Sequence, residues 1–279
     1  MSKAMPHRPS PVRYRTIFLS DIHLGTRGCK AERLLDFLAR HDSSTIYLVG
    51  DVVDGWKLRH GWYFPPSHSE VIQVLLTRAK NGTRVVYVPG NHDEFVRPYV
   101  GHMFGSVEVL DRIIHETADG RRLLVLHGDQ FDVVLRWARW ASLLGSVLYN
   151  ALLAANGIVN RVRRLFGGSG WSLSDWAKRT IKGAVNFIGD YEKSLVEEAA
   201  RAGADGIVCG HIHHAAIDDR LGIAYVNTGD WMESCTAVVE HFDGRMELIR
   251  WTEEHVAAAS GERAGRSADS APALSDMTA

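Results

Sequence analysis

Five short apolar runs in this chain each lead into a polar block rich in Asp, Asn and His. Runs of this length, bounded by turn-forming residues, are typical of buried strands. Sites in open α/β sheets form where such strands end. The repeated pattern therefore predicts an α/β fold that brings five sets of polar side chains to one edge. In chain order, the runs and blocks are 16–19 with Asp21-Ile22-His23, 46–49 with Gly50-Asp51-Val52-Val53-Asp54, 85–88 with Gly90-Asn91-His92-Asp93, 123–126 with His127-Gly128-Asp129, and 206–209 with Gly210-His211-Ile212-His213.

Each block has an ordinary structural explanation when it stands alone. An Asp-x-His pair at a strand end can cap a helix or turn, Gly90-Asn91 is typical of a turn, and a lone His127 is typical of a partly buried histidine. His211 and His213 are harder to explain, because two imidazoles beside an apolar run are costly to bury without partners. Together the blocks favour a centre of two divalent ions about 3.5–4 Å apart, which acts as a hydrolytic clamp for phosphate esters.

Amphipathic helices are predicted between the apolar runs. Leucines share one face over residues 31–41, and apolar residues share one face over 69–80, with Ser67 or Ser69 as the N-cap of the second helix. Strands that alternate with such helices form βα units. The chain up to the third block is therefore predicted to build a parallel sheet.

The pattern changes near the C-terminus. Residues 236–242 and 245–251 are predicted strands joined by Asp243-Gly244, which is a strong hairpin signal. A hairpin added to parallel strands makes the sheet mixed. Residues 253–279 are rich in Ala, Ser and Gly without an apolar period, so we expect a disordered tail there.

Composition limits the class of protein. With 279 residues, of which 46% are hydrophobic and 23% charged, the chain can bury one sizeable core and an accessory element. A net charge of -1 gives no bulk electrostatic reason to expect a nucleic-acid partner. Cys29, Cys209 and Cys235 are odd in number and far apart, which favours a reducing compartment. The first residues lack the apolar region of a signal peptide, so we expect a cytoplasmic protein.

A long insertion separates the fourth and fifth blocks. Residues 141–160 carry no charge, and large apolar residues recur there at near-helical spacing. A membrane span is one interpretation, but asparagines within the segment and a site assembled from both sides of it favour a hydrophobic cap. Basic and aromatic residues follow, a combination that suits contact with a lipid surface. The apolar residues are Trp137, Trp140, Leu144, Leu148 and Leu152, the asparagines are Asn150, Asn156 and Asn160, and the later residues are Arg161, Arg163, Arg164, Trp171, Trp176, Lys178, Arg179 and Lys182.

The insertion could equally be a helical subdomain whose leucines pack on the main core, with residues 161–164 at a solvated helix end. Its position between two site-bearing strands still allows it to overhang the site and set the substrate class. Lys178 and Lys182, four apart on a predicted helix, are candidate phosphate contacts, and ordinary surface lysines are the alternative. Residues 227–231 are predicted to form a structural turn.

The five blocks match, in order, the D-x-H, G-D-x-x-D, G-N-H-D, H-G and G-H-x-H motifs of the calcineurin-like metallophosphoesterase superfamily, and the chain resembles that family over residues 14–251. The resemblance implies a four-layer α/β/β/α sandwich of mixed sheets with an inserted helical cap. The core would comprise residues 12–130 and 204–252. The cap would comprise residues 131–203.

The resemblance also implies roles for individual residues. One metal ion would be held by Asp21, His23, Asp51 and His213, and the other by Asp51, Asn91, His127 and His211, so that Asp51 bridges them. Asn91 and His211 would also contact the substrate. His92 would donate a proton or hydrogen bond to the leaving oxygen. Asp54 or Asp93 would orient His92 or a ligand, and a turn or cap role is the alternative for both.

A closer resemblance is to the bacterial UDP-2,3-diacylglucosamine diphosphatases of lipid A biosynthesis, carried by residues 20–25, 50–54, 210–213 and the insertion. It implies attack by a metal-bridging hydroxide on the pyrophosphate of a lipid-linked nucleotide sugar, giving UMP and 2,3-diacylglucosamine 1-phosphate. Mn is the ion typical of that family, and the ligands also suit Fe, Zn, Co or Ni. The cap would hold the acyl chains. The enzyme would lie on the cytoplasmic face of the inner membrane, with its oligomeric state open.

One residue departs from that closer family, in which an Arg stands at the position of His92. An Arg supplies fixed charge, whereas a His can act as an acid, so the two are not interchangeable. A phosphodiesterase or phosphatase acting on soluble nucleotides or phosphoproteins is therefore an alternative. A noncatalytic scaffold is a more remote one, because buried carboxylates and imidazoles are expensive without metal.

Overall fold

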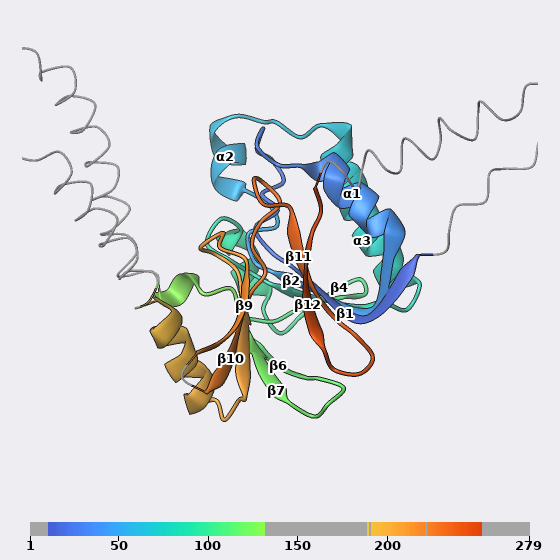
Figure 1. Cartoon of the computed structure of the whole chain (residues 1–279). Helices are drawn as coiled ribbons and strands as arrows, with labels where there is room; N and C mark the ends of the chain where they lie inside the picture. Colours follow the sequence, from blue (N-terminus) through green and yellow to red (C-terminus); the bar gives the residue numbers. More distant parts are fainter. Residues whose placement is uncertain (1–10, 132–188, 190, 221, 253–279) are drawn as a thin grey trace, which may run out of the picture.

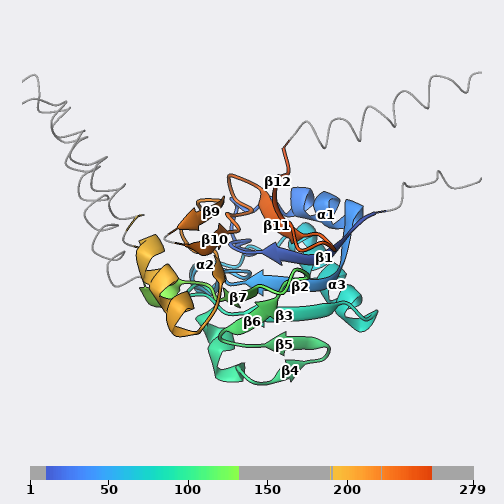
Figure 2. The same ribbon diagram turned by 60° about the horizontal axis from the view of Figure 1, so that its bottom comes forward.

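The computed structural model describes residues 11–131, 189, 191–220 and 222–252 (Figure 1). Two mixed β-sheets face each other in this part of the chain, and helices lie on the outer faces of the pair (Figures 1 and 2). Between the sheets, Phe18 and Tyr47 of the first sheet pack against Val125, Val208 and Val226 of the second. The packing of these two apolar faces forms the centre of the molecule.

The first sheet has the strand order β12-β11-β1-β2-β3-β5-β4. β1, β2, β3 and β5 run parallel to one another, and the terminal hairpin joins β1 through β11 in the antiparallel direction. The mixed sheet and its C-terminal hairpin are therefore confirmed. The strands are β1 (Val12–Leu19), β2 (His41–Val49), β3 (Arg84–Val88), β4 (Met103–Phe104), β5 (Val107–Val109), β11 (Thr236–Glu240) and β12 (Met246–Arg250).

The second sheet has the order β6-β7-β8-β10-β9, in which β7, β8 and β10 are parallel and both edge strands are antiparallel. The apolar runs before His127 and His211 are β7 and β8. The other three strands were not predicted, because they are short and β9 is almost entirely exposed. The strands are β6 (Ile113–Glu116), β7 (Arg122–Val125), β8 (Gly206–Cys209), β9 (Ala216–Arg220) and β10 (Ile223–Asn227).

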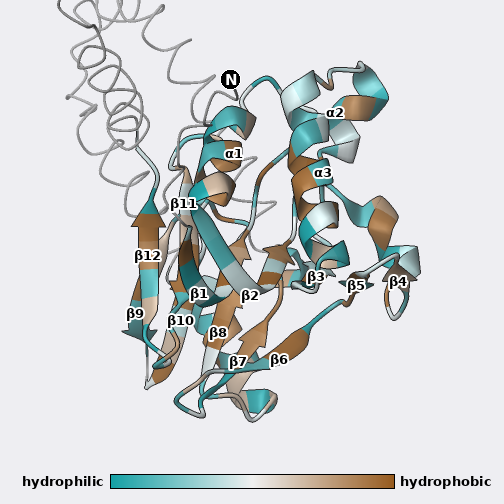
Figure 3. Ribbon diagram, turned by 90° about the vertical axis from the view of Figure 1, so that its right-hand side faces the viewer, coloured by the Kyte–Doolittle hydropathy of each residue, from teal (hydrophilic) through white to brown (hydrophobic). Residues whose placement is uncertain are grey.

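Two long helices cover the outer face of the first sheet. α1 (Ala31–Arg40) and α3 (Pro66–Lys80) lie side by side there (Figure 3), and their buried residues share one core with the outward side chains of β1 and β2. The prediction that Ser67 or Ser69 caps α3 is wrong. The helix begins at Pro66 and makes no side-chain capping bond, since proline suits a first turn with its fixed φ and missing N–H.

A helix that includes residues 191–201 covers the outer face of the second sheet. Its Tyr191, Leu195 and Ala199 pack against Leu124 of β7 and Ile207 of β8. These layers give the α/β/β/α sandwich that the motif resemblance implied, and this fold class is confirmed. Three short helical segments complete the described elements: α2 (Gly55–His60), and the 3-10 helices η1 (Glu94–Tyr99) and η2 (Asp129–Phe131).

Most of the predicted cap lies outside the described residues. This applies to residues 132–188, which include the uncharged stretch 141–160 and the candidate contacts Lys178 and Lys182. It also applies to the predicted tail at 253–279. Within the described residues, no helix is both long enough and apolar enough to cross a membrane.

Candidate metal centre

The five polar blocks meet at one edge of the two sheets. Three groups of side chains there have one potential ligand atom per residue, all within 4.8 Å of one another. All the predicted His and Asp ligands fall into the first two groups, and the third joins His92 to the centre. The groups are Asp21 with His23 and His213, Asp51 with His127 and His211, and His23 with Asp54 and His92.

Unusual backbone conformations mark these residues. Within the described part of the chain, six non-glycine residues have a positive φ, and five of them are predicted ligands. The left-handed region is sparsely populated by residues with a Cβ, and such strain concentrates at functional sites. The ligands therefore sit in tight turns just beyond the strand ends. The five are Asp21, His23, Asp51, His211 and His213, with φ angles of 50, 53, 54, 71 and 54°.

Asp21 contributes one carboxylate oxygen to the first donor group, and its other oxygen supports the fifth polar block. Its Oδ1 lies 3.2 Å from His213 Nε2 and 3.9 Å from His23 Nε2. Its Oδ2 accepts a hydrogen bond of 2.9 Å from the backbone N–H of His211. Asp21 is fully buried, so its carboxylate orientation is fixed by these partners.

Asp51 lies between the two groups. Its Oδ2 is 3.9 Å from His23 Nε2 in the first group and 3.5 Å from His127 Nε2 in the second. Its Oδ1 accepts a hydrogen bond of 2.8 Å from the backbone N–H of His92, which holds the carboxylate in place. A single oxygen that reaches toward both groups has the arrangement required of a bridging ligand.

His127 presents its Nε2 to this centre because its other nitrogen is engaged. The Nδ1 lies 2.8 Å from the backbone oxygen of Val49, to which it can only donate. Such a bond fixes the ring orientation and is the usual second partner of a metal-ligating histidine. Asp129 lies two residues after His127 in the chain. Its carboxylate pairs with Arg97 of η1 at 2.5 Å.

Buried polar atoms without hydrogen bonds test whether the site fits metal ions. Asp21 Oδ1, Asn91 Oδ1 and His127 Nε2 are buried and make no hydrogen bond within the described residues. Leaving such atoms unsatisfied costs about 1–3 kcal/mol each. Oxygen and imidazole nitrogen atoms converging in this way are ligands that suit divalent transition ions. The residues present therefore fit a metal centre.

Charge interactions at the centre shift the pKa values in opposite directions. Burial alone would lower the pKa of His127, but the carboxylates of Asp51 and Asp21 raise it to about 10. The pKa of His213 is likewise raised, because Asp21 outweighs the effect of burial. Burial opposes ionisation of Asp21, yet His213 and His127 hold the pKa of this carboxyl below its ordinary value. Without metal, the site thus keeps Asp21 ionised and favours protonation of His127 and His213.

We therefore expect metal affinity to increase with pH. Ligation requires neutral imidazoles, so ions compete with protons below the raised pKa values of His127 and His213. Affinity should fall as the pH drops from about 8.5 to about 6.5, with protons released on binding. Isothermal titration calorimetry of the metal-free protein in buffers of different ionisation enthalpy measures both quantities. Equal affinity at the two pH values, without proton release, would contradict this assignment.

Three glycines keep the centre open. A Cβ on Gly50 would overlap the ring of His127, and a Cβ on Gly90 would overlap both Asp51 Oδ1 and the same ring. A Cβ on Gly210 would meet Asp21 Oδ2 and Ser20 Oγ at 2.5 Å. From the sequence these glycines indicated only turns, because a close approach between distant segments leaves no local signal.

Replacing Gly90 by alanine is expected to reduce activity and metal content by about 10- to 100-fold, the range for changes that misplace ligands. The added methyl group would displace Asp51 and His127. Metal analysis and turnover measure the effect, and circular dichroism reports the fold. Gly61→Ala is the matched control, since Gly61 has an extended φ of 167° and open space around its Cβ position. Equal metal content in both variants would refute the close-approach argument.

His92 lies beside the first group and approaches two carboxylates. Its Nδ1 is 3.0 Å from Asp54 Oδ2, and its Nε2 is 4.0 Å from Asp51 Oδ2. The ring of Trp56 lies against it, with centroids 4.3 Å apart. Asp54 also caps α2 by accepting a hydrogen bond of 2.8 Å from Lys57 N, so its two expected roles coexist. Trp56 was missed, because an exposed aromatic residue after a motif carries no specific signal.

Asp93 does not orient His92. Its Oδ1 accepts from Gly90 N at 2.5 Å, and its Oδ2 accepts from Val52 N at 2.8 Å and from the Tyr87 hydroxyl at 2.6 Å. Burial and the nearby charge of Asp51 raise the pKa of Asp93. Of the two roles expected for Asp93, these hydrogen bonds support the turn role, because they tie together the two loops that carry Asp51 and Asn91.

The turn at 227–231 supports the centre from the other side. Asn227 Nδ2 donates to the Gly210 oxygen at 2.9 Å, and Trp231 N donates to the Asp21 oxygen at 3.1 Å. Gly229 has a φ of 77°. This geometry agrees with the structural role predicted for the segment.

Comparison with known proteins identifies the family. The family model described as calcineurin-like phosphoesterase matches residues 14–215. The chain belongs to this family. The membership confirms the family that the five motifs resemble.

Two curated relatives share a description. A UDP-2,3-diacylglucosamine hydrolase of Porphyromonas gingivalis is 26% identical over 126 residues, which cover 43% of this chain and 47% of that protein. A UDP-2,3-diacylglucosamine hydrolase of Ralstonia nicotianae is 28% identical over 146 residues, covering 47% and 52%. The chain thus spans about half the length of the curated relatives it matches. The family and both relatives support a metal-dependent phosphoester hydrolase.

Solved structures of more distant proteins are also similar. The phosphoesterase Yfce from E. coli is 14% identical with a TM-score of 0.40, covering 85% of this chain and 99% of its own. Vacuolar protein sorting 29 from Cryptosporidium parvum is 14% identical with a TM-score of 0.40, covering 84% and 94%.

Proposed function

We propose that this protein is a dinuclear-metal hydrolase that cleaves the pyrophosphate of UDP-2,3-diacylglucosamine into UMP and 2,3-diacylglucosamine 1-phosphate. The observation that carries the two-metal part is the position of Asp51 Oδ2 between the two donor groups. The substrate part is supported by the two relatives with that description.

The predicted ligands divide between two ions as the donor groups do. Asp21, His23, Asp51 and His213 would hold one ion, and Asp51, Asn91, His127 and His211 the other. Mn is the ion we propose first, with Fe, Zn, Co and Ni compatible with the same ligands. Divalent ions at these positions supply charge that lowers the pKa of water and offsets the charge of the phosphate oxygens.

The chain's own residues then position and protonate the reacting groups. Asn91 and His211 would contact the phosphate oxygens. His92 keeps its Nδ1 beside Asp54, so its Nε2 faces the centre and can donate a proton to the leaving oxygen as the P–O bond breaks. Asp54 thus acts through His92, by orienting the ring so that Nε2 is the nitrogen that faces the centre.

Exposed aromatic and basic side chains beside the centre support the proposal that the enzyme acts at a lipid surface. Trp62 is 78% exposed, and Trp56 is also exposed. Lys57 and Arg59 lie on α2 between them. Aromatic and basic side chains suit the interface of an anionic membrane. We propose that this face meets the cytoplasmic side of the inner membrane, where the lipid-linked substrate resides.

A second candidate function follows from His92. Because it can act as an acid, it favours a phosphodiesterase or phosphatase that acts on soluble nucleotides or phosphoproteins. The scaffold alternative has less support, since the described residues keep a full set of converging donor atoms.

Hydrolysis assays with Mn separate these functions. UDP-2,3-diacylglucosamine, UDP-glucose and bis-p-nitrophenyl phosphate are compared side by side, with Asp51→Ala as the blank. The proposal predicts a strong preference for the diacylated substrate. Equal or faster cleavage of the soluble esters would refute the proposed substrate and favour the second candidate, and no cleavage of any of the three would refute hydrolysis itself.

A further inference from the structure

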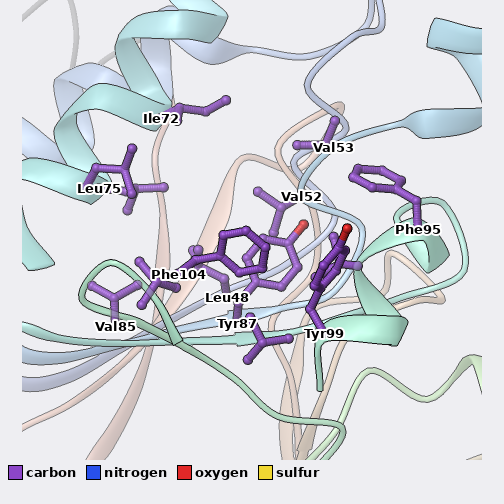
Figure 4. A pocket seen from close by; sticks show the side chains of 14 residues that line it. Leu48, Val52, Val53, Ile72, Leu75, Val85, Tyr87, Phe95, Tyr99 and Phe104 are labelled. Atoms are coloured by element: carbon purple, nitrogen blue, oxygen red, sulfur yellow. The ribbon is translucent and has the colours of Figure 1, made fainter. Parts of the chain in front are cut away.

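A cavity of about 280 Å³ lies beneath α3 (Figure 4). Its walls come from α3, from the outward side chains of β2, β3 and β5, from η1 and from the β4 edge. Cavities about half this size, when lined by apolar side chains, stay dry and bind small hydrocarbons.

The lining has almost no hydrogen-bonding capacity. The side chains around the cavity are aliphatic or aromatic, and only Tyr87 and Tyr99 among them carry a polar atom. The Tyr87 hydroxyl already donates to Asp93 Oδ2 at 2.6 Å. A peptide, sugar or nucleobase would leave its own polar groups unsatisfied there, at a cost of several kcal/mol. The chemistry of the walls therefore selects a hydrocarbon.

Exposed apolar side chains surround the mouth of the cavity. Leu76 of α3, Phe95 and Tyr99 of η1 and Phe104 of β4 are each about half exposed and also line the cavity. Figure 4 shows Phe95, Tyr99 and Phe104 around one side of it. Contiguous exposed apolar surface of this kind marks a binding site more often than a mainly polar surface does. A chain entering here would continue from an apolar rim into an apolar interior.

The inner wall belongs to the loops of the metal centre. Val52 and Val53 line the cavity and lie between Asp51 and Asp54 in the chain. Phe95, also in the lining, packs closely against Gly55, and Gly55 N donates to the His92 oxygen at 2.9 Å. An occupant would thus contact the reverse side of the segments that carry the candidate catalytic residues.

We propose that this cavity binds a single hydrocarbon chain, with the polar end of the molecule left outside the mouth. The chain belongs to the diacylated substrate or to a separate fatty acid or phospholipid, since both present the same methylene groups. The first source rests on the proposed function, and the second does not.

Binding of laurate to the full chain, measured by isothermal titration calorimetry below the micelle concentration, tests the proposal directly. Phe104→Asp places a charge at the mouth, where Phe104 is 51% exposed. Phe242→Asp is the matched control, since Phe242 is 60% exposed beyond β11 and does not line the cavity. We expect the wild type and the control to bind laurate, and Phe104→Asp to bind at least about tenfold more weakly, a difference of about 1.4 kcal/mol.

Leu76→Asp on α3 provides a second test if Phe104→Asp unfolds, as judged by circular dichroism. It should weaken laurate binding in the same way. No binding by the wild type, or equal binding by the wild type and a folded mouth variant, would overturn the proposal.

Turnover by the mouth variants distinguishes the two sources of the chain. If the chain is the substrate's, Phe104→Asp raises KM for UDP-2,3-diacylglucosamine and leaves cleavage of bis-p-nitrophenyl phosphate unchanged. If the chain comes from a separate lipid, laurate binding is lost while both KM values stay the same. Failure to hydrolyse the diacylated substrate at all would refute the proposed function, and the laurate result would still decide the cavity.

Discussion

Asp51→Ala is expected to abolish detectable turnover and to lower the metal content of the purified protein. Its Oδ2 faces His23 in one donor group and His127 in the other. Removing it would deprive both ions of a ligand and leave Asp21 as the main counter-charge of the imidazoles. Changes in the partners of metal ligands cost about 10- to 100-fold, so loss of a ligand common to both ions should exceed that range.

Metal analysis and turnover of bis-p-nitrophenyl phosphate measure the effect of Asp51→Ala. Asp218→Ala is a suitable control, because Asp218 is an exposed carboxylate on β9 that forms an ion pair with Arg220 and accepts a hydrogen bond from Asp219 N. The control should keep full activity. An Asp51→Ala protein that folds and retains two ions would contradict the bridging role.

His92→Ala is expected to reduce turnover by about 10²- to 10⁴-fold, the usual contribution of general acid catalysis. Metal content should not change, because the predicted ligands do not include His92. The loss should be smaller for bis-p-nitrophenyl phosphate than for a phosphodiester with an alkoxide leaving group, since p-nitrophenolate needs little protonation to leave. A merely structural role would slow both substrates equally.

Two further variants complete the His92 experiment. His102→Ala, at an exposed histidine outside the centre, should behave like the wild type. His92→Arg introduces a fixed positive charge, and it should keep charge for the pyrophosphate while losing the acid. Unchanged turnover in His92→Ala would remove His92 from the chemistry.

The centre could be predicted from the sequence because each part of it has a local signal. An apolar run followed by Asp51 or His127 indicates both a strand and the polar group at its end. Parallel strands then require the ends to meet, so the grouping follows from the order of the blocks. The fold class followed from the same motifs through their resemblance to a family.

The features that were missed depend on contacts between distant segments. The need for Gly90 arises from Asp51 and His127, which approach it only in the folded chain. Trp56 gains significance from its contact with His92. The cavity combines residues of α3, β5 and η1, and the short β5 has no pattern that predicts a strand. Sequence periodicity describes one element at a time and does not indicate where packing is incomplete.

The most direct test of a two-metal hydrolase is a titration of the metal-free protein with Mn, in which bound ions per chain and turnover of bis-p-nitrophenyl phosphate are followed together. We expect activity to rise until two ions are bound, and Asp51→Ala never to reach this state. Full activity with one bound ion per chain would contradict a two-metal centre.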